Sequence, residues 1–185
     1  MRGMTSTPAS VAWFARHAAT GIALLLLAAC ATPAEPERMA VTQASGAGFP
    51  PKLQHAMCVR KVTGGEATNP LWVSEVDDAG FTEALSNSLD SVGLLAEQGS
   101  CRYFIDVDLL GLAQPTFGFT FEVTSHANYK VYDAAGKSAL LATIAGAYTA
   151  DFGEAPLGSM RLKRANEGAI RASITQFLDR LRTMK

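Results

Sequence analysis

Apolar and polar residues alternate strictly along residues 117–132. One side of this stretch carries Phe117, Phe119, Phe121, Val123, Ser125, Ala127, Tyr129 and Val131. The other side carries Gly118, Thr120, Glu122, Thr124, His126, Asn128, Lys130 and Tyr132. Because successive side chains of a β-strand point to opposite faces, this pattern predicts a long antiparallel strand with one buried and one solvated face. Residues rich in Pro, Asp and Gly at 114–116 and 133–137 predict turns at its two ends.

Two neighbouring stretches show the same period of two. Apolar residues occupy every second position of residues 101–109, and residues 139–152 supply the next strand after the turn. Three successive strands joined by short turns predict a meander. A shorter candidate strand, residues 55–62, precedes them and is ended by Thr63-Gly64-Gly65.

Two further stretches have the spacing of amphipathic helices. In residues 81–92 the apolar positions recur at intervals of three and four, with Asp77-Asp78 placed as the N-cap and Gly93 as the C-cap. Residues 160–182 form the second helix, for which Ser159 is the expected N-cap. Gly168 inside this helix is unfavourable for helix formation and therefore indicates a close crossing over the sheet.

The element order is therefore β-α-β-β-β-α. The simplest fold that buries every apolar stripe is an α+β two-layer sandwich, a four-stranded mixed sheet with two helices on one face. The chain has 185 residues, of which 48% are apolar, which fits one folded domain and excludes a disordered chain. Its 16 Lys+Arg against 17 Asp+Glu leave no basic surface charge of the kind that binds nucleic acid.

The N-terminus has the pattern of an export signal. Arg2 and Arg16 precede the apolar run of residues 18–29, which is too short to form a stable membrane span. The sequence therefore predicts a signal peptide over residues 1–29. Its removal also removes Arg2 and Arg16, so that the mature chain is more acidic than the full sequence.

The end of that run, Leu27-Ala28-Ala29-Cys30, resembles the lipobox of bacterial lipoproteins. The resemblance implies cleavage before Cys30 and acylation of this cysteine with three fatty acyl chains, palmitate among them, which would anchor the protein to a membrane. Ala31 lacks the aspartate that commonly retains lipoproteins in the inner membrane, so the expected location is the periplasmic leaflet of the outer membrane. The alternative is an uncleaved apolar helix that happens to end in Ala-Ala-Cys.

Residues 30–51 follow as a stretch rich in Pro, Ala, Gly and Ser without apolar periodicity. This composition predicts a flexible stalk behind the lipidated cysteine, and a single α+β domain over residues 52–185. The two remaining cysteines, Cys58 and Cys101, are an even pair near the starts of two strands that a helical crossover would make parallel neighbours. In an oxidising compartment they predict a disulfide, with two buried free thiols as the alternative.

The polar side of the strands offers the strongest candidate site. If residues 114–116 form a tight hairpin, Asp106 and Asp108 lie opposite residues 121–123, near Glu122 and His126. Carboxylates and an imidazole in this arrangement would bind a divalent cation or act as acid and base, although a solvated sheet face explains the same residues. Thr120, Thr124 and Lys130 share this face and complete the candidate binding surface. No nucleophile or nucleotide-binding motif accompanies them, so we expect no catalytic residue, metal or cofactor.

Two further sets of residues admit a binding role. The basic residues Arg161, Lys163, Arg164 and Arg171 indicate a solvated helix face, or a contact with lipid A phosphates or an acidic partner. The aromatic residues Trp72, Phe104 and Tyr132 indicate either core packing or a contact surface.

Residues 81–89 and Gly93-Leu94-Leu95 are similar to the first helix, and its exit, of small Gram-negative outer-membrane lipoproteins of the LptE-like and YajG-like α/β type. The resemblance implies a non-enzymatic binding or assembly factor of the cell envelope, with an outer-membrane protein, a transport complex or lipopolysaccharide as partner. The first alternative is a metal-dependent enzyme using Asp106, Asp108, Glu122 and His126. The second is a carrier with a lipid or small-ligand pocket between helices and sheet.

Overall fold

The computed structural model describes residues 31–42, 48–69, 74–116 and 118–184. The predicted signal peptide, the predicted acylation site Cys30, Trp72 and Phe117 lie outside the described residues. The described residues contain no helix with the length and apolarity needed to cross a membrane.

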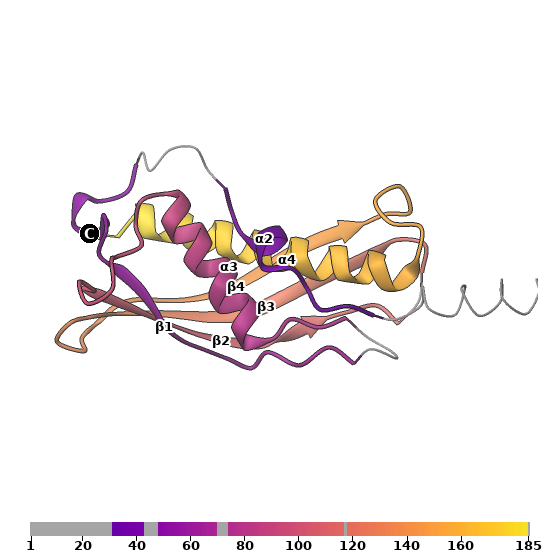
Figure 1. Ribbon diagram of the computed structural model, residues 1–185, viewed down its shortest axis with the longest axis horizontal. Helices are drawn as coiled ribbons and strands as arrows, with labels where there is room; N and C mark the ends of the chain where they lie inside the picture. The colour runs from indigo at the N-terminus through magenta and orange to yellow at the C-terminus, as the bar shows by residue number, and fades with distance from the viewer. Residues whose placement is uncertain (1–30, 43–47, 70–73, 117, 185) are drawn as a thin grey trace, which may run out of the picture. The chain divides into compact units, whose positions relative to one another are not determined.

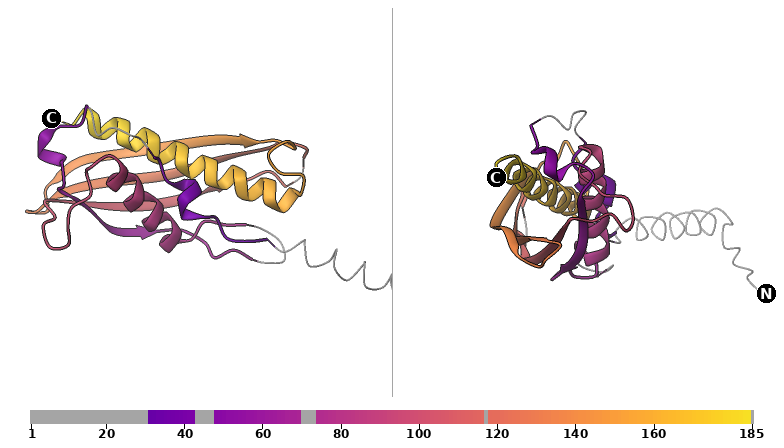
Figure 2. Two further views of the ribbon diagram at one scale, coloured as in Figure 1. Left: turned by 45° about the horizontal axis from the view of Figure 1, so that its top comes forward. Right: turned by 90° about the vertical axis from the view of Figure 1, so that its left-hand side faces the viewer.

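The sheet contains four strands in the order β1-β2-β3-β4 (Figure 1). These are β1 (Met57–Thr63), β2 (Tyr103–Ala113), β3 (Phe121–Asp133) and β4 (Ser138–Ala150). The β1–β2 pair is parallel and the other two pairs are antiparallel. Helix α3 (Asp78–Ser91) connects β1 to β2, and α4 (Gly158–Arg182) follows β4. Both helices cover the same face of the sheet (Figure 2), which confirms the predicted α+β two-layer sandwich.

Tyr129 joins the two layers at the centre of the core. Its fully buried ring stacks on Phe177 of α4 with the ring centroids 4.4 Å apart and meets the edge of Phe81 of α3 at 6.4 Å. Its hydroxyl lies 2.9 Å from Ser173 Oγ, so the polar end of the ring is hydrogen-bonded inside the core. Burial raises the pKa of this phenol.

Helix α4 approaches β4 closely because each element has a glycine at the contact, Gly168 on α4 and Gly146 on β4. A Cβ atom on Gly168 would lie 2.2 Å from the ring of Tyr148, and one on Gly146 would lie 2.4 Å from the carbonyl oxygen of Ala169. Neither distance is compatible with a side chain. The predicted close crossing at Gly168 is confirmed.

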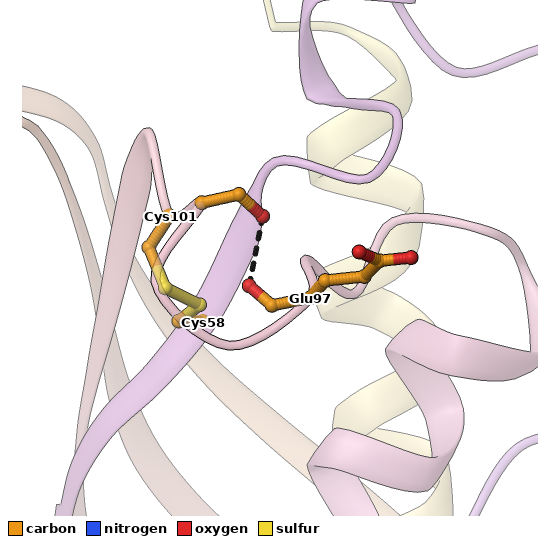
Figure 3. The surroundings of a disulfide bond; sticks show 4 residues. Cys58, Glu97 and Cys101 are labelled. Carbon is orange, nitrogen blue, oxygen red and sulfur yellow. Dashed lines mark hydrogen bonds between the residues drawn. A yellow bond between two sulfur atoms is a disulfide. The ribbon is translucent and has the colours of Figure 1, made fainter.

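The disulfide Cys58–Cys101 links β1 to the turn that precedes β2, with the two Cα atoms 5.7 Å apart (Figure 3). The backbone amide and the side-chain hydroxyl of Ser100 both donate to the carbonyl oxygen of Glu97, at 3.0 and 2.8 Å, and close that turn. The prediction of this disulfide is confirmed.

The described start of the chain differs from the predicted stalk. Residues 31–42 pack against the domain through the short helix α2 (Pro36–Met39), and Met39 is fully buried. The amide of Val41 donates to Ser88 Oγ of α3 at 2.9 Å. A second short helix, η2 (Pro51–Leu53), buries Leu53. The folded unit therefore begins at Ala31 rather than at residue 52.

Several predicted boundaries shift in the structure. Strand β3 begins at Phe121 because its partner β4 ends opposite, at Ala150, and Phe119 lies 86% exposed beyond the ladder. The expected burial of Phe119 is therefore wrong. Helix α4 begins at Gly158 with Leu157 in the N-cap position and no side-chain cap, so Ser159 does not cap it.

Candidate functional site

The face of the sheet turned away from α3 and α4 is called here the outer sheet face. On β2 it carries Phe104, Asp106 and Asp108, and on β3 it carries Glu122, Thr124, His126, Asn128, Lys130 and Tyr132. On β4 it carries Leu141, Thr143, Ala145, Ala147 and Thr149. The alternation expected from the sequence places these side chains on one side of the sheet, and Figure 2 shows both long helices on the other.

The half of the outer sheet face near β1 holds ion pairs. Arg60 donates from Nε and Nη2 to the two carboxylate oxygens of Asp106 at 2.8 and 2.5 Å. The same guanidinium lies 5.1 Å from the ring centroid of Tyr132 and 5.9 Å from that of Phe104. These hydrogen bonds hold the pKa of the Asp106 carboxyl below its usual value, so it stays ionised at neutral pH.

Asp108 is bound in the same way by its neighbours across the strands. Lys130 Nζ donates to Asp108 Oδ2 at 2.6 Å, and Thr63 Oγ1 donates to Oδ1 at 2.8 Å. The hydrogen bond from Lys130 is the main cause that lowers the pKa of Asp108, and the same bond raises the pKa of Lys130. Neither group is tuned to exchange a proton near neutral pH, as a general acid or base requires.

The strand register separates the residues of the predicted metal or acid–base site. Asp106 and Asp108 lie opposite Lys130 and Asn128, not opposite residues 121–123. Glu122 lies eight positions before Lys130 along β3, which corresponds to about 27 Å in an extended strand. The structure therefore does not bring Asp106 and Asp108 together with Glu122. Among the described residues no cluster of three or more His, Cys, Asp or Glu side chains could hold a metal ion.

Two features shift this register. Residues 114–120 form a connection longer than a tight turn, because β3 begins only at Phe121. A β-bulge between Leu109 and Gly111 then inserts an extra residue into β2. The bulge places Gly111 at φ +140°, a conformation that favours glycine, and leaves Leu110 61% exposed.

The other half of the outer sheet face is uncharged over β4. Thr124 and His126 of β3 lie opposite Ala147 and Ala145, and Glu122 lies opposite Thr149. Thr120 is exposed just before the strand begins. The 13 residues of β4 include no charged side chain. Sequence alternation places these residues, but it does not show that β4 forms an edge of the sheet.

As an edge strand, β4 is open to hydrogen bonding along one side. The side-chain amide of Gln176 in α4 donates to the carbonyl oxygen of Ala145 at 2.9 Å. Backbone N–H and C=O groups alternate in direction along a strand. Thr143 and Ala147, two positions before and after Ala145, therefore turn theirs toward the same open edge.

The predicted basic cluster on α4 is not a solvated face. Arg161 and Lys163 are buried, with 6% and 9% exposure. Lys163 Nζ donates to Glu35 Oε1 at 2.7 Å, and Arg164 donates to Glu167 Oε2 at 3.0 Å. Lys163 therefore joins α4 to the start of the chain, whereas Arg161 donates to carbonyl oxygens of the β4–α4 connection. Three of the four predicted residues are thus not free surface charges.

A hollow of about 430 Å³ lies at one end of the domain, between the β2–β3 connection and the first turn of α4. Its lining residues are Gln114, Pro115, Thr116, Phe121, Gly158, Ser159 and Leu162. Between the centres of the helices and the sheet, where the carrier hypothesis requires a pocket, the side chains of Tyr129, Phe81 and Phe177 fill the space.

Comparison with known proteins shows the fold. No protein-family model and no curated protein sequence matches this chain. The structure is similar to that of a Xanthomonas campestris protein described by the family model DUF330, with a TM-score of 0.55 at 12% identity, covering 83% of this chain and 96% of that one. A hypothetical protein from Chlamydia trachomatis gives a TM-score of 0.51 at 11% identity, covering 71% and 97%.

A minor lipoprotein from Acinetobacter baumannii gives a TM-score of 0.44 at 10% identity, covering 71% of this chain and 93% of that one. The first two matches show that this α+β architecture is shared by proteins of Xanthomonas and Chlamydia. At these identities they carry no information about activity.

Proposed function

We propose that this protein is a lipid-anchored, non-enzymatic binding factor of the bacterial cell envelope, and that its outer sheet face binds another envelope protein. The observation that carries the proposal is the outer sheet face itself. It spans four strands, has both long helices on its far side and ends in the uncharged edge strand β4.

The proposed location rests on the N-terminal sequence. Leu27-Ala28-Ala29-Cys30 matches a lipobox, and Ala31 favours delivery to the periplasmic leaflet of the outer membrane. The disulfide Cys58–Cys101 supports this location, because structural disulfides persist in the periplasm and are rare in the cytosol.

The charges of the outer sheet face favour a protein partner over a glycolipid. On β1, Lys61 lies opposite Asp106, and Arg60 bonds to the same carboxylate. These two cations and Lys130 are balanced by the three carboxylates of Asp106, Asp108 and Glu122. Arg60 and Lys130 are already bonded to Asp106 and Asp108. A polyanionic lipopolysaccharide would need an excess of cations on this face. Balanced charges beside small uncharged side chains suit a protein surface.

The ion pairs also favour binding over catalysis. Asp106 and Asp108 are held ionised by their partners, and Glu122 is far along β3 from both. Their role in this proposal is to fix the orientation of Arg60 and Lys130 on the surface that the partner meets.

Photocrosslinking in intact cells tests the proposal. A photoreactive amino acid replaces Thr124, His126 or Ala147 on the outer sheet face, and Asn87, exposed on α3, serves as the control position. We expect one protein adduct from the three sheet positions and none from Asn87. Equal capture at Asn87, or no protein adduct from an acylated and folded protein, would overturn the proposal. An adduct with lipopolysaccharide would overturn the choice of partner.

A further inference from the structure

Exposed apolar side chains gather at one end of the domain. Six large apolar residues are exposed among the described residues, and four of them lie where β3 begins and where β4 passes into α4. These four are Phe119, Phe152, Leu157 and Met160, with 86%, 60%, 44% and 46% exposure. They are called here the end patch.

The sheet and α4 bring these residues to the same place. Phe121 and Ala150 are the last pair of the β3–β4 ladder, so Phe119 and Phe152 each lie two residues beyond its end. Leu157 is the N-cap residue of α4, and Met160 lies in its first turn. A Cβ atom on Gly158 would lie 3.9 Å from the ring of Phe121, which shows that this turn packs directly on the end of β3.

Buried Arg161 holds this end in shape. Its Nη1 donates to the carbonyl oxygens of Ala155 and Pro156 at 2.7 and 3.1 Å, which fixes the connection between β4 and α4. Its Cζ lies 5.1 and 5.5 Å from the ring centroids of Phe121 and Phe152. Phe152 is therefore held in place while most of its surface remains exposed.

The described chain also begins at this end of the domain. Lys163 Nζ, on α4 one turn after Met160, donates to Thr32 Oγ1 at 3.2 Å, and Ser74 Oγ donates to the carbonyl oxygen of Thr32 at 2.8 Å. Figure 1 shows the indigo start of the described chain at the end of the sheet where β4 turns into α4. Cys30 precedes Thr32 by two residues and consecutive Cα atoms are about 3.8 Å apart, so an acyl anchor on Cys30 would be joined to this end of the domain by a short connection.

We propose that the end patch lies in the interfacial region of the membrane that carries the acyl anchor. This inference rests on the proposed function, because it requires acylation of Cys30. Exposed aromatic and aliphatic side chains enter the boundary between headgroups and acyl chains, and a covalent anchor two residues before Thr32 would keep them there. Asp151 and Glu154 lie beside Phe152 in the connection between β4 and α4, and their negative charges repel anionic lipids. Electrostatic attraction to anionic lipids therefore does not drive the contact.

Tryptophan fluorescence in the full-length, acylated protein tests the contact. The sequence has two tryptophans, of which Trp13 leaves with the predicted signal peptide. In a Trp72→Phe background, Phe119→Trp and Phe152→Trp place the sole indole in the end patch. Ala135→Trp, in the β3–β4 turn at the opposite end of the sheet, and Leu141→Trp, on the outer sheet face, are matched controls.

Each protein is reconstituted in neutral phosphatidylcholine vesicles whose acyl chains are brominated near the headgroup. We expect the bromines to lower the fluorescence of the two end-patch indoles by about twofold or more, as for side chains about 5–10 Å into the interface, and to leave both controls unchanged. Equal quenching at positions 119 and 135, or quenching at position 141 alone, would overturn the inference.

Flotation and mass measurement separate this inference from the proposed function. A protein that floats with the vesicles and carries the acyl mass on Cys30, but shows no quenching at positions 119 and 152, contradicts the membrane contact alone. A protein that neither floats nor carries acyl chains contradicts the anchor and with it both proposals. Phe119 is so exposed that its replacement leaves the packed core intact, and a thermal melt of each variant checks this.

Discussion

At position 168 the lack of a side chain is a packing requirement. Alanine is favoured over glycine inside a helix by about 1 kcal/mol. A Cβ atom here would nevertheless lie 2.2 Å from the ring of Tyr148. We therefore expect Gly168→Ala to lower the free energy of unfolding by about 1–3 kcal/mol, as overpacking of a filled site does. Urea denaturation measures the change.

Gly158→Ala is the matched control in the same helix, because its Cβ atom would meet the ring of Phe121 at an ordinary 3.9 Å. It is expected to leave stability unchanged or slightly improved. Similar stabilities for the two variants would show that α4 can move away from Tyr148 without cost.

The carboxylates of the outer sheet face predict a dependence on pH. The folded pKa of Asp106 and of Asp108 lies below the unfolded value, about 3.9 for aspartate. Their contribution to stability is therefore present above the unfolded pKa and is lost as the pH falls through the lower folded pKa. Asp106→Asn and Asp108→Asn should each be less stable than the parent at pH 7, and the difference should shrink as the pH falls below the unfolded value. Denaturation curves at a series of pH values measure this, and a difference that does not change with pH would assign the loss to something other than the charge.

Single residues were predictable from sequence where one local rule governs them. Period-two alternation identified Tyr129 as buried, and the cost of glycine in a helix identified Gly168 as a close contact. The burial of Arg161 was not predictable from sequence. It depends on contacts with a carbonyl oxygen of the preceding loop and with the rings of Phe121 and Phe152, which only the fold brings together.

At the scale of the elements, the disulfide Cys58–Cys101 is expected to stabilise the parallel pair β1–β2. Joining Cys58 to Cys101 restricts the unfolded chain between them, so Cys58→Ala with Cys101→Ala should lower the free energy of unfolding by about 2–4 kcal/mol. Chemical denaturation of the oxidised parent and the double variant measures the loss. Reduction of the parent should reproduce it, and a reduced parent as stable as the oxidised one would contradict the prediction.

The identity and order of the elements were predictable, but their register was not. Alternation within each strand fixes which side chains share a face, and the strand pairing places the polar residues of β2 and β3 on the same face. Which residues lie opposite one another depends on the length of the 114–120 connection and on the bulge at Leu110. Neither feature leaves a periodic signal in the sequence. The sequence therefore predicted the start of β3 as the partner of Asp106 and Asp108, whereas they lie opposite Lys130 and Asn128.

For the whole domain, the first described residues are predicted to unfold with the core. Glu167 is 1% exposed, accepts from the amide of Glu35 at 3.0 Å and binds Arg164. Glu167→Ala removes these bonds and leaves the partly buried guanidinium of Arg164 without its carboxylate, at a cost of about 2 kcal/mol. Hydrogen exchange should show slow amides at Glu35 and Val41 in the parent and faster exchange at Glu35 in the variant.

Ser88→Ala is the control, because it removes the acceptor of the Val41 amide and leaves the Glu35 bond in place. Exchange at Val41 should then rise while that at Glu35 stays slow. Fast exchange of both amides in the parent would support a flexible stalk instead. Sequence could not predict the packed segment, because Met39 and Val41 are isolated apolar residues in a stretch rich in Pro and Ala.

The packing of residues 31–42 determines how far the domain could travel from an acyl chain on Cys30. A free stalk over residues 31–51 would extend up to about 70 Å and let the domain explore a hemisphere of that radius. Because Thr32 is bonded to Lys163 and Ser74, the free connection between an acylated Cys30 and the domain shortens to about one residue, Ala31. Encounters are then restricted to the plane of the lipid. Partners embedded in the same leaflet gain a high effective concentration, and partners that diffuse freely in solution gain none.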